Sequence, residues 1–131
     1  MFLDASALCA VLLQEDDGDL YDAKVAGASA PLTSAVAVFE TVLAVARASQ
    51  SDVVTARRAV SEYLEVSNVR MVAIGESELD RALDAFDRFG QGRHPARLNM
   101  GDCLAYACAK TNGVPLLFKG DDFMQTDIAI A

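Results

Sequence analysis

Short apolar runs alternate with helical patterns along the whole chain, and this alternation restricts the fold more than any other feature. Several runs have the length and composition of buried strands: residues 1–4, 31–33, 69–72, 115–118 and 128–130. Longer stretches with helix-start signals or helical periodicity separate them: residues 6–14, 19–26, 34–48, 52–66, 75–89 and 102–111. The pattern predicts an α/β, three-layer fold with a mainly parallel central sheet flanked by helices.

The size and composition of the chain predict one domain over residues 1–131. At this length a hydrophobic core is feasible, and 53% of the residues are apolar. The three cysteines form no CxxC pair and are interpreted as reduced core residues. No basic leader precedes the first apolar run, and no run is long enough to cross a membrane. We therefore expect a cytoplasmic protein with no membrane association.

The net charge of −8 argues against nucleic acid as a partner, since its backbone repels anions. Two features weaken this argument. Several carboxylates could be gathered around metal ions, and the positive charges could be collected on one surface; five of them lie in the C-terminal part: Arg88, Arg93, Arg97, Lys110 and Lys119. Charge alone leaves the partner undecided.

Acidic residues follow two of the predicted strands. Asp4 ends the run FLDAS, and Asp121 and Asp122 follow the strand at 115–118. Ligands of parallel sheets bind beyond the carboxyl ends of the strands, so these acids lie where a site is expected. The alternative for Asp121 and Asp122 is ordinary turn chemistry, since Gly-Asp-Asp is a common turn sequence.

Two further acids lie on predicted helices. Glu40 is the only acid in SAVAVFETVLAVARA, and its neighbours three and four residues away are apolar. Either a nearby metal ion offsets the cost of burying it, or it faces water on a narrow stripe. Asp102 opens the helix GDCLAYACAK, where it either serves a site or stabilises the helix N-terminus.

The set of four acidic positions indicates metal-dependent chemistry. With one histidine and scattered cysteines, the chain has no zinc ligand set and no hydrolase triad. Carboxylate oxygens suit Mg²⁺ or Mn²⁺, and such ions activate water in phosphodiester hydrolysis.

Four segments together resemble the PIN domain, and in particular its VapC branch, the toxin ribonucleases of type II toxin–antitoxin systems. These segments are FLDASAL, AVFETVLAVA, LNMGDCLAYACAK and PLLFKGDDF, and they span essentially the whole chain in the family's order. The resemblance implies a PIN-like fold and a Mg²⁺- or Mn²⁺-dependent endoribonuclease that cleaves RNA. It also implies a cognate VapB-type antitoxin and a homodimer.

Carried over by position, the resemblance makes Asp4, Glu40 and Asp102 the first three acids of the site. Counting from the end of the strand favours Asp121 as the fourth catalytic acid, although Asp122 could serve instead, and both are candidate metal ligands beside the first three acids. Asp122 is also expected to cap a short helix beginning at Phe123.

Three residues are expected to bind substrate. Ser6 is the hydroxyl of the Asp-x-Ser start. Arg93 and Arg97 lie in the loop before Asp102, where they hold flanking phosphates or simply face solvent.

Two other function classes remain open from the sequence. One is an Asp-based phosphotransfer domain, with Asp4 as phosphoacceptor and Lys119 as phosphate partner. Its motif lacks the second aspartate expected two residues after the first. The other is a catalytically idle PIN-like binding module, against which stands the presence of all four acidic positions.

Overall fold

Four parallel strands form a sheet in the order β3-β2-β1-β4. The computed structural model describes all 131 residues. Phe2 is in register with Leu32 on one side and with Leu116 on the other. The strands are β1 (Phe2–Leu3), β2 (Leu32–Ser34), β3 (Arg70–Val72) and β4 (Leu116–Leu117). The prediction of a parallel sheet between helices is confirmed.

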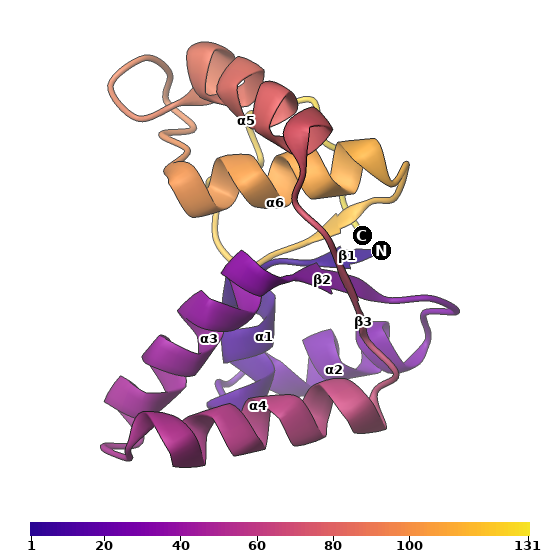
Figure 1. The fold of residues 1–131 in the computed structure, drawn as a ribbon, viewed down its shortest axis with the longest axis vertical. Coiled ribbons are helices and arrows are strands. Elements are labelled where there is room, and N and C mark those ends of the chain that lie inside the picture. Colours follow the sequence, from indigo (N-terminus) through magenta and orange to yellow (C-terminus); the bar gives the residue numbers. More distant parts are fainter.

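Helices cover both faces of this sheet. In Figure 1, α5 and α6 lie on one face, and the other four helices lie on the opposite face. The helices are α1 (Ala5–Leu12), α2 (Gly18–Ala26), α3 (Ala35–Ala48), α4 (Val53–Val66), α5 (Glu76–Phe89) and α6 (Met100–Thr111). None of them has the length and apolar character that a membrane crossing requires.

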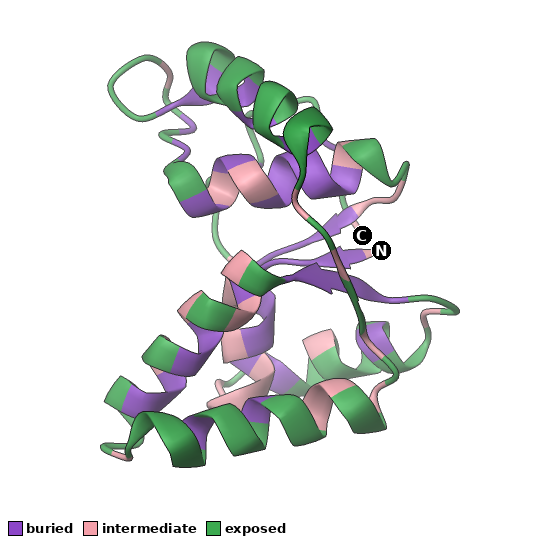
Figure 2. Ribbon diagram, viewed as in Figure 1, coloured by how far each residue is buried: buried purple, intermediate pink, exposed green.

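The two faces of the sheet pack into separate cores. Phe2 and Leu116 join the large cluster under α5 and α6, whereas Leu3 and Leu117 pack with Leu8 on the other face. This division follows from the period of two in a strand, which turns successive side chains to opposite faces. Helices cover both faces, and the residues of the central strands β1 and β2 are buried, including the polar Thr33 and Ser34 of β2 (Figure 2).

The strand order reverses between β1 and β4, and this reversal locates the site. Along the chain, β2 and β3 are added on one side of β1, while β4 is added on the other. At such a switch point the connections leave in opposite directions and open a crevice at the carboxyl ends of the strands. Asp4 follows β1 at this point.

Three predicted features of the secondary structure were wrong: one helix start, one strand and one short helix. Helix α6 begins at Met100 rather than Asp102, because Asn99 caps it through the backbone N–H of Asp102. The expected strand at 128–130 is reduced to a single parallel bridge between Ile130 and Leu116. No helix begins at Phe123, where the chain forms consecutive turns.

Candidate active site

Asp4 stands at the junction of β1 and α1 and is only 5% exposed. Its Oδ2 accepts a hydrogen bond from the backbone N–H of Ser6, at 2.9 Å, and another from the Ser6 hydroxyl, at 2.5 Å, so the carboxylate caps α1. Burial raises the pKa of Asp4; the Ser6 hydrogen bonds oppose this rise, and the charge of Asp122 adds to it.

Glu40 reaches the first turn of α6 from the middle of α3. A Cβ atom built on Gly101 would lie 2.4 Å from Oε1 of Glu40, so only glycine permits this approach. Burial and the charge of Asp4 both raise the pKa of Glu40. The half-buried carboxylate therefore belongs to the contact between α3 and α6, not to a solvated stripe. Sequence reasoning missed Gly101, although Gly-Asp at a helix start was visible.

Asp102 occupies the third position of α6 and forms a reciprocal cap with Asn99. Its Oδ2 accepts from the backbone N–H of Asn99 at 2.9 Å, while its own N–H donates to the Asn99 side chain at 3.0 Å. Burial raises the pKa of Asp102 to about 6 against the opposing Asn99 hydrogen bond, and the charges of Asp4, Asp122 and Glu40 add to the rise. Asp102 thus takes part in the cap of its helix, and its pKa also responds to the charges of the other acids; its role in a site stays a prediction.

The fourth acid in electrostatic contact with this group is Asp122. Its charge contributes to the raised pKa values of Asp4 and Asp102. The side chain of Asp122 makes no hydrogen bond, and the expected helix cap is absent because the helix does not form. Asp121 instead uses its backbone carbonyl to accept from the N–H of Met124 at 3.0 Å. We refer to Asp4, Glu40, Asp102 and Asp122 as the acidic site.

The donor chemistry of the acidic site fits a hard divalent cation. All four side chains offer carboxylate oxygens, the ligands that Mg²⁺ and Mn²⁺ prefer, and their mutual repulsion is what a bound cation relieves. In both Asp4 and Asp102, Oδ2 is the oxygen that accepts these hydrogen bonds. No three acid, histidine or cysteine side chains stand in ligand geometry for a metal ion in this conformation.

Ser6 connects the acidic site to the segment after β4. Its hydroxyl donates to Asp4 and accepts from the backbone N–H of Lys119 at 3.0 Å. Both bonds are made within the chain, so the structure supports a role in holding Asp4. Nothing in these contacts tests the expected role of Ser6 in substrate binding.

The two arginines expected to bind phosphate lie apart from these contacts. Arg93 pairs with Asp87 at 2.8 Å, and its guanidinium lies 5.8 Å from the centre of the Phe86 ring. Arg97 is exposed and has a left-handed backbone conformation, with φ of 55°. Neither arginine forms a hydrogen bond or ion pair with the acidic site, and their role in binding substrate stays a prediction.

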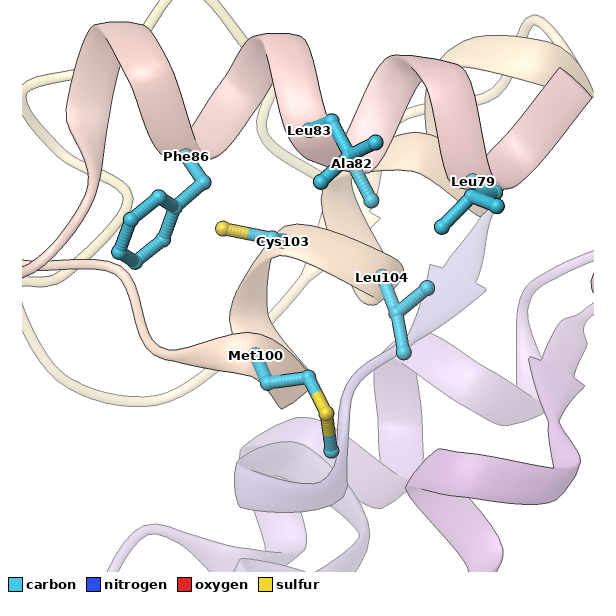
Figure 3. A pocket seen from close by; sticks show the side chains of 7 residues that line it. All are labelled: Leu79, Ala82, Leu83, Phe86, Met100, Cys103 and Leu104. Carbon is cyan, nitrogen blue, oxygen red and sulfur yellow. The ribbon is translucent and has the colours of Figure 1, made fainter.

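Two largely apolar surfaces include residues that are next to Gly101 and Glu40 in the sequence. Between α5 and α6 lies a groove with a wholly apolar lining: Leu79, Ala82, Leu83, Phe86, Met100, Cys103 and Leu104 (Figure 3). Met100, which precedes Gly101, is 72% exposed. The second surface lies over α3, α4 and β3, and there Phe39, the residue before Glu40, is 63% exposed.

Comparison with known proteins agrees with this architecture. The PIN domain family model matches residues 1–129. The chain is 40% identical to VapC ribonuclease Mb0640 of Mycobacterium bovis, covering 98% of this chain and 96% of that protein. It is 38% identical to a ribonuclease VapC of Mycolicibacterium smegmatis, covering 98% of each.

Solved structures share the fold at low sequence identity. VapC20 of Mycobacterium tuberculosis, described as a toxin that cleaves the sarcin–ricin loop, superposes with a TM-score of 0.78 at 17% identity, covering 99% of this chain and 97% of that one. A toxin–antitoxin complex from Klebsiella pneumoniae superposes with a TM-score of 0.72 at 12% identity, covering 99% and 95%. Because the family model spans almost the whole sequence and the relatives are matched nearly end to end, this chain belongs to the VapC ribonucleases of the PIN domain family.

Proposed function

We propose that the chain is a Mg²⁺- or Mn²⁺-dependent endoribonuclease and the toxin of a type II toxin–antitoxin pair in the cytoplasm. The observation that carries this proposal is the acidic site. Its four carboxylates come from distant parts of the sequence, and three of them have raised pKa values to which the charges of others in the group contribute. Perturbed carboxylates gathered at the carboxyl ends of parallel strands are typical of catalytic sites.

A divalent ion bound among these carboxylates would supply an activated water and stabilise the leaving oxygen in phosphodiester hydrolysis. Asp4 and Asp102 are the main ligand residues, since each is fixed by a helix cap that leaves Oδ1 for another partner. Glu40 and Asp122 complete the charge of the site and orient the attacking water. This assignment moves the fourth role from Asp121 to Asp122.

Cleavage of labelled RNA by the purified protein tests the proposal directly. We expect cleavage with Mg²⁺ or Mn²⁺, none in EDTA, and none from Asp4→Asn in either metal. Cleavage in EDTA, or full activity of Asp4→Asn, would remove the metal-dependent mechanism. An idle binding module would show no cleavage under any condition. The phosphotransfer alternative has lost its phosphate partner, because the ammonium of Lys119 is paired with Glu15 and Asp17.

We also propose a VapB-type antitoxin and a second copy of the chain as partners, one on each apolar surface. An antitoxin over Phe39 would cover the edge of the acidic site at Glu40. The groove in Figure 3 suits a second copy, because an apolar surface can meet its own copy without opposing like charges.

Paired variants separate these two contacts. Phe39→Asp should weaken antitoxin binding and leave the dimer intact, whereas Leu83→Asp should shift sedimentation to the monomer and spare antitoxin binding. The reverse pattern would exchange the two assignments, and no effect of either variant would reject both.

A further inference from the structure

Lys119, two residues after β4, is held through both its backbone and its side chain. Its backbone N–H donates to the hydroxyl of Ser6 at 3.0 Å, and Ser6 in turn holds Asp4. Its ammonium forms ion pairs with Glu15 and with Asp17, the latter at 2.5 Å. Lys119 therefore joins the start of α1 to the turn at residues 15–18 that follows the same helix, which we call the acidic turn. The positive charge of Lys119 is neutralised locally.

The acidic turn is itself anchored on α1. The backbone N–H of Glu15 donates to the carbonyl of Ala10 at 3.0 Å, and the N–H of Gly18 donates to the carbonyl of Glu15 at 2.8 Å. A Cβ atom on Gly18 would lie 2.5 Å from the Ala10 carbonyl oxygen, so the turn packs directly against the helix. The ion pairs between Lys119 and this turn thus connect Lys119 to a fixed part of the fold.

The segment that carries Asp122 begins at Lys119 and is flanked by two buried aromatic residues that contact each other. Phe118 precedes it and Phe123 follows it, with ring centres 4.9 Å apart. Between them, Gly120 has φ of +101°, a conformation that L side chains rarely adopt, and so sets the direction of the chain. The position of Asp122 is therefore determined by a short loop with one strongly held residue, Lys119.

We propose that Lys119 is a positioning residue, whose ion pairs with Glu15 and Asp17 hold the loop at residues 119–122 so that Asp122 faces Asp4 and Asp102. This inference rests on the role of Asp122 proposed above. It differs from a role in attracting RNA, because a lysine paired with two carboxylates presents no net positive charge to a phosphate.

Two sets of substitutions with opposite charge separate positioning from attraction. Lys119→Gln removes one positive charge, and Glu15→Gln/Asp17→Asn removes two negative charges. If Lys119 positions Asp122, both should lower kcat by about 10–100-fold, the range for losing a supporting contact in a metal site, with KM for RNA nearly unchanged. If Lys119 attracts RNA, the first should raise KM and the second should lower it, which would overturn the proposal.

Binding of Mn²⁺, measured by calorimetry without RNA, provides a second readout. Both sets should weaken Mn²⁺ binding by about 10–100-fold. Lys110→Gln is the matched control, because Lys110 is also a paired lysine but contacts Asp127, away from the acidic site. It should retain parental kcat and Mn²⁺ affinity. Parental Mn²⁺ affinity in both sets would overturn the proposal.

The combined triple variant tests whether the three residues act as one unit. Its loss should be no larger than that of the more damaging of the two sets, whereas multiplied losses would show independent roles. Melting curves identify any variant that fails to fold, in which case the other set carries the test.

Asp122→Asn separates the role of Lys119 from the role of Asp122, on which it rests. If Asp122→Asn cleaves RNA at the parental rate, the role of Asp122 is rejected. If Asp122→Asn is inactive while Lys119→Gln is fully active, only the role of Lys119 is rejected.

Discussion

The carboxylate of Glu40 lies against the α-carbon of Gly101, closely enough that a methyl group at residue 101 would be 2.4 Å from Oε1. One contact thus determines both how near α6 approaches α3 and where the Glu40 carboxylate lies relative to Asp102. Glycine at position 101 is as much a requirement of the acidic site as the acids are.

Gly101→Ala should therefore damage activity more than stability. The new methyl group must displace either Glu40 or the first turn of α6. We expect a loss of about 10–100-fold in RNA cleavage and about 1–3 kcal/mol in unfolding free energy. Gly27→Ala is the control, since a Cβ there meets its nearest atom at 3.4 Å. Full activity of Gly101→Ala would show that the Glu40 contact is dispensable.

Asp102→Asn should abolish cleavage while making the metal-free protein more stable at pH 7. The amide oxygen can still accept the hydrogen bond from Asn99, so the cap survives, but the repulsion from Asp4, Asp122 and Glu40 is lost. Such a gain in stability with a loss of function is common at active sites. Thermal melting in EDTA and RNA cleavage with Mn²⁺ measure the two effects, and a lower melting temperature than that of the parent would contradict the repulsion.

Stability of the metal-free chain should fall as pH rises from 3.8 to about 6. Burial raises the pKa of Asp102 from 3.8 to about 6, so in this window the folded chain binds more protons than the unfolded chain. The stabilisation is complete below the unfolded value and is lost as pH passes the folded value. Asp4 and Glu40, whose pKa values are also raised, contribute with the same sign.

Melting temperatures measured across this pH range in EDTA check the prediction. The slope should be shallower in Asp102→Asn, which has no carboxyl at this position to titrate. Below pH 3.8 the trend should reverse, because Tyr106 lowers the pKa of Asp127 to about 2 and the stabilisation from that carboxylate is lost there. A melting temperature that rises steadily from pH 4 to pH 7 would count against a repulsive acidic site.

Millimolar Mn²⁺ should raise the melting temperature at pH 7. A ligand that binds only the folded chain stabilises it by mass action, by about 2.7 kcal/mol at one hundred times its dissociation constant. The shift should disappear in Asp4→Asn/Asp102→Asn, which removes the two main ligand charges. An equal shift in that double variant would place the ion elsewhere on this acidic chain.

Asp122→Asn should lower RNA cleavage, while Asp121→Asn should remain near the parental rate. The charge of Asp122 reaches Asp4 and Asp102, whereas the structural contact of Asp121 is made by its backbone, which the substitution preserves. The two variants have the same charge, so nonspecific effects on RNA binding cancel in the comparison. Loss of activity in Asp121→Asn alone would return the fourth role to that residue.

The parts of the site that the sequence predicted are those marked by local signals. Asp4 ends an apolar strand and Asp102 lies at a helix start, and both positions follow from short-range patterns. The start of α6 was predicted two residues late, although Asn99 and Asp102 have the spacing of a reciprocal cap. That boundary could have been found from the sequence.

The parts that could not be predicted depend on contacts between distant segments. Nothing near Gly101 in the sequence indicates that Glu40 packs on it, and nothing near Lys119 indicates Glu15 and Asp17 as its partners. The proposed choice of Asp122 over Asp121 concerns the chain after β4, where Gly120 has a positive φ that the sequence does not reveal. Counting residues from the end of a strand takes no account of such a conformation.

The position of β4 beside β1 also affects when the enzyme can form during translation. Strand β1 is made first, but the neighbour on one of its edges is supplied by residues 116 and 117, far along the sequence. The acidic site likewise lacks Asp122 until that residue has been made and has left the ribosome. Until then a nascent chain has an unpaired edge on β1 and lacks one of the proposed acids, so the ribosome and message that produce it do not yet meet the complete proposed site.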